Sequence, residues 1–248
     1  MRINTILTPL MVEELYFAGR ISVVIDVLRA TSTIVTAIKN GAKEVVPVGS
    51  LDFSKIASAS SFGGRTMRGG EKNSRKIEGF DLGNSPLEYT SEIVAGKSIV
   101  FFTTNGSKAI VKTKYGTGSF ICSFLNASKV AGFTYARGKD FDIVCSGRNG
   151  DFSLEDTVCA GMLIDEVMKL GGEVELSDAS KVALELFKKH GDDLPGLFAL
   201  SEHGRVLAAE GFTADLEYCA QKNITDVVPV YESTSIKLFD PSNHLTNN

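Results

Sequence analysis

The 248-residue sequence has no tryptophan, only six prolines, three histidines and four cysteines, and no long apolar run. Its densest apolar stretch, Ile99 to Phe102, has the length of a strand, whereas a membrane-spanning helix needs roughly 18 apolar residues. The cysteines show no CxxC spacing, which argues against a zinc site and favours buried, reduced thiols. Glu13 and Glu14 lie where a signal peptide would carry its apolar segment. We therefore expect no membrane partner, no export signal and a cytoplasmic location.

Net charge is also small, since 26 Lys and Arg face 30 Asp and Glu, for a formal charge of −4. No basic run is interleaved with aromatic residues, which argues against a nucleic-acid partner. A hydrophobic content of 43% excludes a disordered chain. At roughly 150 residues per domain, the length predicts one domain over residues 1–240, or two closely associated halves over 1–170 and 171–240. We expect residues 241–248 to form a flexible tail.

Several familiar catalytic motifs are missing. No GxGxxG follows the first predicted strand, and Gly70 stands where a Walker A motif would need its lysine. Leu28 occupies the position at which a haloacid-dehalogenase phosphatase carries its second aspartate. Cys145 and Arg148 are too close together for the loop of a cysteine phosphatase. The three histidines are scattered along the chain and are predicted to be structural: His190, His203 and His244.

Short apolar runs alternate with longer amphipathic segments along most of the chain. The apolar runs predict strands at residues 21–27, 44–48, 65–70, 98–103, 119–122, 141–145, 226–231 and 235–239. The amphipathic segments predict helices at residues 31–40, 51–59, 107–114, 127–136 and 154–170, with several short helices within 178–221. Continuous apolar strands that alternate with helices are typical of a mostly parallel sheet covered on both faces. The sequence thus predicts a three-layer α/β fold with a helix-rich C-terminal part.

Ligands of such sheets bind beyond the carboxyl ends of the strands, and four predicted strand ends carry polar clusters. The first cluster begins at Asp26, a charged residue at the end of an apolar strand, which needs a partner or a function. The planar guanidinium of Arg29 can form two hydrogen bonds to a phosphate, and the hydroxyl groups of Thr31 and Ser32 can donate hydrogen bonds to the same anion. A capped helix with a salt bridge at the strand end explains these residues equally well.

The second cluster comprises residues 69–72 and 79–86. Glu71 and Asp81 supply oxygen ligands of the kind that Mg²⁺ prefers, and Lys72 adds a positive charge. An exposed, turn-rich loop explains this cluster somewhat better than a site does.

The third cluster, residues 103–107, follows the most apolar strand. Its hydroxyl groups together with Asn105, Gly106 and Ser107 are similar to a phosphate cradle, although an ordinary strand-to-helix turn has the same composition.

The fourth cluster, residues 145–151, leads into the longest predicted helix. Acidic residues such as Glu155 and Asp156 are normal in a first helical turn. Arg148 and Asn149 between two glycines exceed what a helix cap requires, so a functional role is favoured here.

Five blocks of sequence fall within or beside these clusters, in this order: DVLRATSTI (residues 26–34), GGEKN (69–73), GFDLGNSP (79–86), TTNGSKA (103–109) and SGRNGDFSLEDTVCAG (146–161). Together they resemble the 2-phosphosulfolactate phosphatase family, and the resemblance extends from about residue 21 to beyond residue 204. It implies a Mg²⁺-dependent acid phosphatase that converts 2-phospho-3-sulfolactate into 3-sulfolactate and phosphate, a step of coenzyme M biosynthesis. It also implies a three-layer α/β fold unlike the common phosphatase folds. Lys72 departs from the family pattern, in which we expect arginine.

This chemistry assigns expected roles to the clusters. Asp26, Glu155 and Asp156 are the predicted catalytic residues, and Mg²⁺ is the predicted cofactor, held by Asp26, Glu71 and Asp81. Anion binding is assigned to Arg29, Thr31, Ser32, Lys72, Asn105, Gly106, Ser107, Arg148 and Asn149.

Some alternatives stay open at the level of sequence. Water attacks the phosphorus directly, or a phosphoenzyme forms on Asp26 or Ser32. The substrate is 2-phospho-3-sulfolactate or another small phosphorylated 2-hydroxy acid. A transferase, a lyase or a non-enzymatic binding protein for an anionic metabolite would use similar clusters. The expected partner is thus a small anionic, phosphorylated molecule, and a homodimer is one possible assembly.

Overall fold

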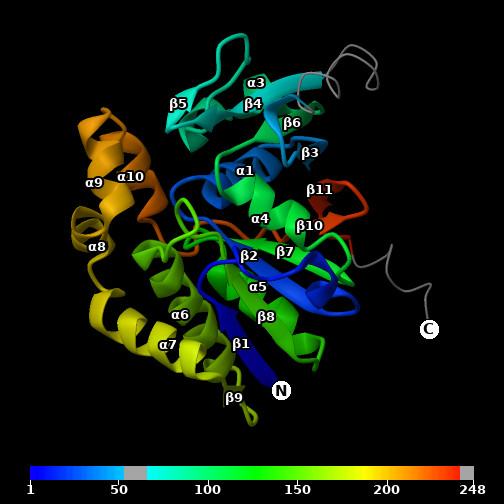
Figure 1. Cartoon of the computed structure of the whole chain (residues 1–248), viewed down its shortest axis with the longest axis vertical. Helices are drawn as coiled ribbons and strands as arrows, with labels where there is room; N and C mark the ends of the chain where they lie inside the picture. Colours follow the sequence, from blue (N-terminus) through cyan, green and yellow to red (C-terminus); the bar gives the residue numbers. More distant parts are fainter. Residues whose placement is uncertain (53–65, 241–248) are drawn as a thin grey trace.

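A computed structural model describes residues 1–52 and 66–240 of the chain. Among these residues eleven strands form one sheet, in the order β5-β4-β6-β3-β11-β10-β7-β2-β8-β1-β9 (Figure 1). The strands are β1 (Arg2–Ile6), β2 (Ile21–Ile25), β3 (Glu44–Pro47), β4 (Thr66–Lys72), β5 (Arg75–Lys76), β6 (Ser98–Phe102), β7 (Gly118–Cys122), β8 (Phe141–Cys145), β9 (Glu175–Leu176), β10 (Pro229–Glu232) and β11 (Ser235–Leu238).

The described helices connect these strands or follow them. They are α1 (Ala30–Lys39), α3 (Ser91–Val94), α4 (Gly106–Lys112), α5 (Ala127–Ala136), α6 (Leu154–Lys169), α7 (Asp178–His190), α8 (Leu194–Leu200), α9 (Glu202–Ala209) and α10 (Thr213–Cys219). Two short 3-10 helices are η1 (Glu14–Phe17) and η2 (Pro86–Glu88). None of the described helices is both long and apolar enough to cross a membrane.

The predicted fold class is confirmed. Strands β1, β2, β7 and β8 pair in parallel, as do β3, β4 and β6, and helices cover both faces of the sheet. Each predicted strand is present with its ends shifted by no more than a few residues. The predicted helix over 51–59 lies mainly outside the described residues, and the predicted tail over 241–248 lies wholly outside them. Strand β1 was not predicted, because its alternation of exposed and buried residues includes polar side chains.

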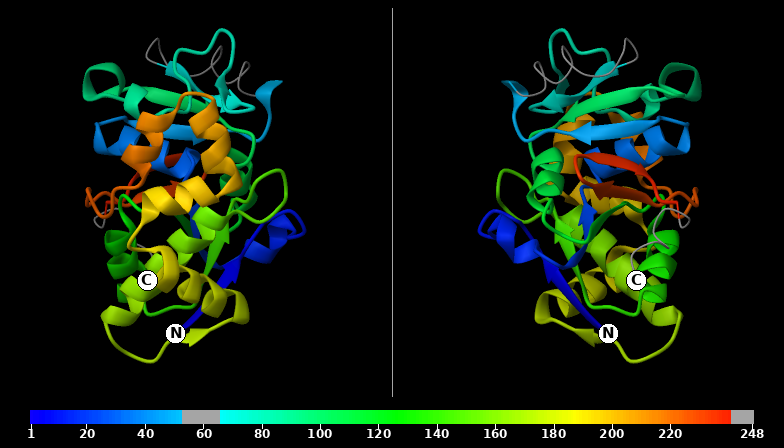
Figure 2. Two further views of the ribbon diagram at one scale, coloured as in Figure 1. Left: turned by 90° about the vertical axis from the view of Figure 1, so that its left-hand side faces the viewer. Right: turned by 90° about the vertical axis from the view of Figure 1, so that its right-hand side faces the viewer.

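Alternate residues of the central strands face opposite helical layers. Val23 and Ile25 of β2 pack with α5 and α6, whereas Val24 between them packs with α1 and α4. Figure 2 shows α7 to α10, coloured yellow to orange, gathered on one side of the molecule. These helices form the predicted helix-rich C-terminal part.

The last two strands complete the sheet near its middle. β10 and β11 form an antiparallel hairpin between β7 and β3, so residues beyond 171 pair with strands from the first part of the chain. The division into one domain or two halves stays a prediction, but the sheet is continuous across the suggested boundary.

Helix α1 is buried along almost its whole length, from Ala30 to Ile38. Its hydroxyl groups must therefore find partners inside the protein, because an unpaired buried polar group costs free energy. Thr31 Oγ1 donates to the carbonyl of Asp26 at 2.8 Å, and Ser32 Oγ donates to the carbonyl of Val27 at 2.9 Å. These bonds fix the segment that joins β2 to α1.

Two glycines within helices give opposite predictions for stability. A Cβ at Gly161 in α6 would overlap the carbonyl oxygen of Ala183 and lie 2.6 Å from Cβ of Phe187 in α7, whereas a Cβ at Gly132 in α5 would meet nothing within 4 Å. We expect Gly161→Ala to destabilise the protein by about 1–3 kcal/mol through overpacking. Gly132→Ala should stabilise it by up to about 1 kcal/mol, because alanine has the higher helix propensity. Urea unfolding of both variants tests the packing, and a shift of the same sign in both would contradict it.

Candidate active site

A polar cleft of about 180 Å³ opens at the carboxyl ends of β2, β4, β6 and β8. All four predicted polar clusters contribute to its lining. The predicted site residues in the lining are Asp26, Arg29, Glu71, Asn105, Arg148 and Asn149. Residues without a predicted ligand role also line it, among them Ser74, Thr104, His203 and Val206.

Asp26 lies at the end of β2 and is 7% exposed. Its Oδ1 accepts a hydrogen bond from the backbone N–H of Ala30 at 3.2 Å. Burial raises the pKa of Asp26 to about 7, and the nearby charge of Glu71 adds to this rise. A Cβ at Gly106 would overlap Oδ2 of Asp26, so only glycine fits at the start of α4. The cleft thus contains a carboxyl group that exchanges its proton near neutral pH.

Glu71 belongs to β4, in the other half of the sheet. Its Oε1 accepts a hydrogen bond from the backbone N–H of Thr104, and its Oε2 accepts one from the backbone N–H of Ser74, both at 2.7 Å. These two bonds connect the β4–β5 turn with the loop after β6, and they hold the carboxylate at the cleft.

The cleft offers a magnesium ion only a small number of protein ligands among the described residues. No group of three or more His, Cys, Asp and Glu within the described ranges is arranged to hold a metal ion. Asp26 and Glu71 nevertheless line the same cleft. Because Mg²⁺ is commonly bound by one or two carboxylates together with water and substrate phosphate, these two residues fit such an ion.

The guanidinium of Arg29 is buried and contacts three other residues. Its guanidinium forms an ion pair with Asp215 of α10 at 2.5 Å and donates to the carbonyl of Ser74 at 2.8 Å. It also stacks on the ring of Phe212, 3.9 Å from the ring centre. Arg29 therefore forms a salt bridge to a distant helix, which differs from the strand-end salt bridge that the sequence left open, and it lines the cleft as well. Asp215 was not found from sequence because 186 residues separate it from Arg29.

Arg148 and His203 form another part of the cleft wall. Arg148 pairs with Glu202, which is next to His203 in α9. Desolvation lowers the pKa of His203 to about 4, and the positive charge of Arg148 adds to this effect. The imidazole is thus neutral at pH 7, and it lies in the wall although the sequence predicted a structural role.

Glu155 lies behind His203. Its Oε1 is 3.8 Å from Nδ1 of His203, and it borders a small pocket next to the cleft. Burial raises the pKa of Glu155. A carboxylate at this place can orient the imidazole, but it does not line the cleft itself.

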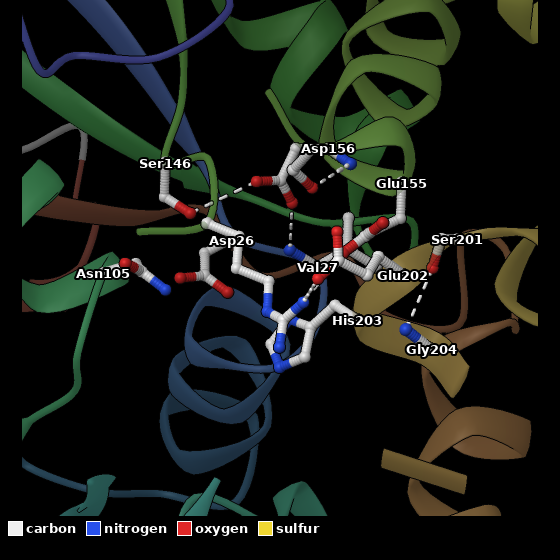
Figure 3. Close-up of polar contacts among 12 residues, drawn as sticks. Asp26, Val27, Asn105, Ser146, Glu155, Asp156, Ser201, Glu202, His203 and Gly204 are labelled. Atoms are coloured by element: carbon white, nitrogen blue, oxygen red, sulfur yellow. Dashed lines mark hydrogen bonds and ion pairs between the residues drawn. The ribbon is translucent and has the colours of Figure 1, made fainter. Parts of the chain in front are cut away.

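Asp156 is a connector between two loops of the cleft (Figure 3). Its Oδ1 accepts a hydrogen bond from the backbone N–H of Val27 at 2.8 Å. Its Oδ2 accepts bonds from the hydroxyl of Ser146 at 3.2 Å and the backbone N–H of Gly147 at 3.3 Å. Burial raises the pKa of Asp156 well above its usual value. Since Asp156 does not line the cleft, its position supports a role in holding the loops rather than the predicted catalytic role.

Several other predicted ligands lie away from the cleft. Thr31 and Ser32 use their hydroxyls for backbone bonds, and Ser107 Oγ likewise donates to the carbonyl of Val48 at 2.9 Å. Lys72 and Asp81 are exposed and lie outside the lining. Their predicted ligand roles stay predictions, because the direction of each side chain depends on burial that the sequence does not specify.

The fold and the site define an α/β protein with a charged cleft at the carboxyl ends of its parallel strands. Residues 6–234 match the family model described as 2-phosphosulpholactate phosphatase. The chain is 41% identical over 228 residues to a relative from Symbiobacterium thermophilum. The matched region covers 92% of this chain and 97% of the relative. It is 39% identical over 242 residues to one from Clostridium perfringens strain SM101, which covers 97% of each chain. Both relatives are named probable 2-phosphosulfolactate phosphatase.

The chain belongs to the 2-phosphosulfolactate phosphatase family, as its sequence blocks predicted. It is an enzyme of the phosphoric monoester hydrolase class.

Asp26 gives the sharpest test of the site. We expect Asp26→Asn to lower turnover by at least about 100-fold, which is about 2.7 kcal/mol of transition-state stabilisation. The folded state raises the pKa of Asp26, so its ionised form destabilises the wild type as the pH rises from about 4 towards 7. The variant should therefore melt above the wild type at pH 8, and this difference should vanish below about pH 4.

Phosphate release and thermal melting of the purified variant measure both effects. Asp192→Asn is the matched control, because Asp192 is exposed in the turn between α7 and α8. A lower melting temperature with nearly normal turnover in Asp26→Asn would make Asp26 a structural residue.

Proposed function

We propose that this chain hydrolyses 2-phospho-3-sulfolactate to 3-sulfolactate and inorganic phosphate with the help of Mg²⁺. The observation that carries the proposal is one cleft lined by two carboxylates, Asp26 and Glu71, and two guanidinium groups, Arg29 and Arg148. Such a cleft suits a phosphate ester and a cation together. The substrate is taken from the names of the relatives.

Different residues of the cleft have different roles in the proposed reaction. Mg²⁺, held by Asp26 and Glu71, would supply positive charge to the phosphoryl oxygens. Arg29 and Arg148 would bind the same oxygens through charge-assisted hydrogen bonds, and the buried carboxylate of Asp215 keeps Arg29 in place. The neutral imidazole of His203 lies in the cleft wall, where its N–H can donate a hydrogen bond to an oxygen of the substrate.

The surroundings of Ser32, Asp26 and Cys145 favour Asp26 among the candidate nucleophiles. Ser32 Oγ is fully buried and bonded to a backbone carbonyl, which leaves it no path to phosphorus. Asp26 lines the cleft, so either its carboxylate attacks the phosphorus or it activates a water molecule that does. Cys145 is buried, and burial raises the pKa of its thiol well above the usual value, so a thiolate mechanism finds no support.

The family match also supports a proposal for the pathway and the compartment in which the enzyme acts. We propose a reaction of the coenzyme M biosynthesis type in the cytoplasm, for which the supporting observation is the match of the chain to the phosphatase family over residues 6–234.

Metal removal tests the proposed cofactor. We expect phosphate release to be lost after treatment with EDTA and restored by Mg²⁺ or Mn²⁺, because the cleft offers oxygen ligands from Asp26 and Glu71. The measurement is inorganic phosphate release before chelation, after it and after each metal is added back. Full activity after exhaustive chelation would contradict the metal site.

A substrate panel tests the proposed selectivity. Phosphates of 2-hydroxy acids with a second anionic group should have kcat/KM values at least about tenfold above those of neutral alcohol phosphates. The physical reason is that the positive groups around the cleft attract a substrate that carries more negative charge than a single phosphate. Equal kcat/KM values across the panel would show that these groups do not recognise the organic part of the substrate.

A further inference from the structure

A second cavity of about 440 Å³ lies directly beside the active cleft. Thr104, Asn105 and Asn149 line both spaces, so the cavity and the cleft adjoin at these residues. Oδ1 of Asn105 accepts a hydrogen bond from the backbone N–H of Asn149 at 3.1 Å, which ties the two sides of this boundary together. We call this space the side cavity.

The side cavity differs from the cleft in charge. Its described lining contains two lysines, Lys108 and Lys112, and no carboxylate. The cleft contains the carboxylates of Asp26 and Glu71 together with the guanidinium groups of Arg29 and Arg148, so its positive charges are balanced by negative ones. An anionic group without a metal ion is therefore better placed in the side cavity than in the cleft.

The two lysines of the side cavity have different surroundings. They are four residues apart in α4, which puts them on the same face of the helix. Lys112 Nζ donates to the carbonyls of Pro9 at 2.5 Å and Leu10 at 3.2 Å, and thereby holds the opposite wall. Lys108 is exposed, and within residues 1–52 and 66–240 its ammonium group has neither an ion pair nor a hydrogen bond. Its charge is available for a ligand.

The arginines of the cleft are already compensated by protein carboxylates. Arg29 pairs with Asp215, and Arg148 pairs with Glu202. The proposed substrate carries a sulfonate on the carbon next to the one that bears the phosphate. When the phosphate is bound in the cleft, the sulfonate lies only a few bonds away, and the side cavity adjoins the cleft at this range.

We propose that the side cavity binds the sulfonate group of the substrate and that Lys108 determines this specificity. The inference rests on the proposed function for the phosphate end of the substrate. Lys72, which the sequence predicted to bind an anionic group, lies outside both cavities, whereas Lys108 lines the side cavity.

The test compares two substrates that differ in the sulfonate alone, 2-phospho-3-sulfolactate and 2-phospholactate. In Lys108→Gln, kcat/KM for the first should fall at least about tenfold, mainly through KM, as expected for one lost charge-assisted contact. The value for 2-phospholactate should stay within about twofold, and Lys108→Arg should recover most of the lost selectivity. Lys39→Gln is the matched control, because Lys39 is exposed in the last turn of α1, at the end of the helix remote from Asp26. Equal losses on both substrates, or no loss on either, would overturn the assignment.

A binding measurement separates this inference from the proposed function. Calorimetric titration with 3-sulfolactate and with lactate requires no turnover. If the wild type releases no phosphate from 2-phospho-3-sulfolactate, the proposed function fails. A Kd for 3-sulfolactate that is at least about tenfold weaker in Lys108→Gln, with lactate unaffected, still supports the side cavity. Equal Kd values in both proteins, or no binding of 3-sulfolactate to the wild type, would overturn it.

Discussion

The burial of α1 is the constraint on which the site depends. A helix enclosed from Ala30 to Ile38 cannot leave its hydroxyl groups unpaired, so they bond to nearby carbonyls and fix the chain between β2 and α1. Asp26 and Arg29 stand in this fixed segment. Their positions therefore follow from packing, and the cleft is held in place by the core of the protein.

A second constraint joins the loops around the cleft. Asp156 bonds to the segments after β2 and β8, and Glu71 bonds to the loop after β6. The C-terminal helices complete the site, because α9 and α10 supply Glu202 and Asp215 to the two arginines. Parts of the chain that are far apart in sequence thus set the geometry of a few charged groups. Such preorganised charges are effective because they need little rearrangement when the reaction occurs.

Local pattern was sufficient to predict the fold class and the four strand ends that form the cleft, because apolar periodicity and the carboxyl-end rule act over short distances. It was not sufficient to predict which side chains reach the cleft. Thr31 and Ser32 have the right chemistry, but their burial directs their hydroxyls to the backbone. His203 and Lys108 were given no ligand role from the sequence, although Lys108 lies within the TTNGSKA block, because their places beside the two cavities depend on tertiary folding. Strand β1 was missed for a related reason, as its polar residues are paired by the sheet and not by local contacts.

The most direct test of the account is a crystal structure of the Asp26→Asn variant with 2-phospho-3-sulfolactate and Mg²⁺ bound. The variant retains the shape of the cleft and should turn over slowly enough to trap the substrate. The account predicts the phosphate among Glu71, Arg29 and Arg148, with the sulfonate beyond Asn105 near Lys108. Substrate bound at another surface, or bound in the cleft with its sulfonate directed away from Lys108 and its phosphate away from Arg29, would contradict it.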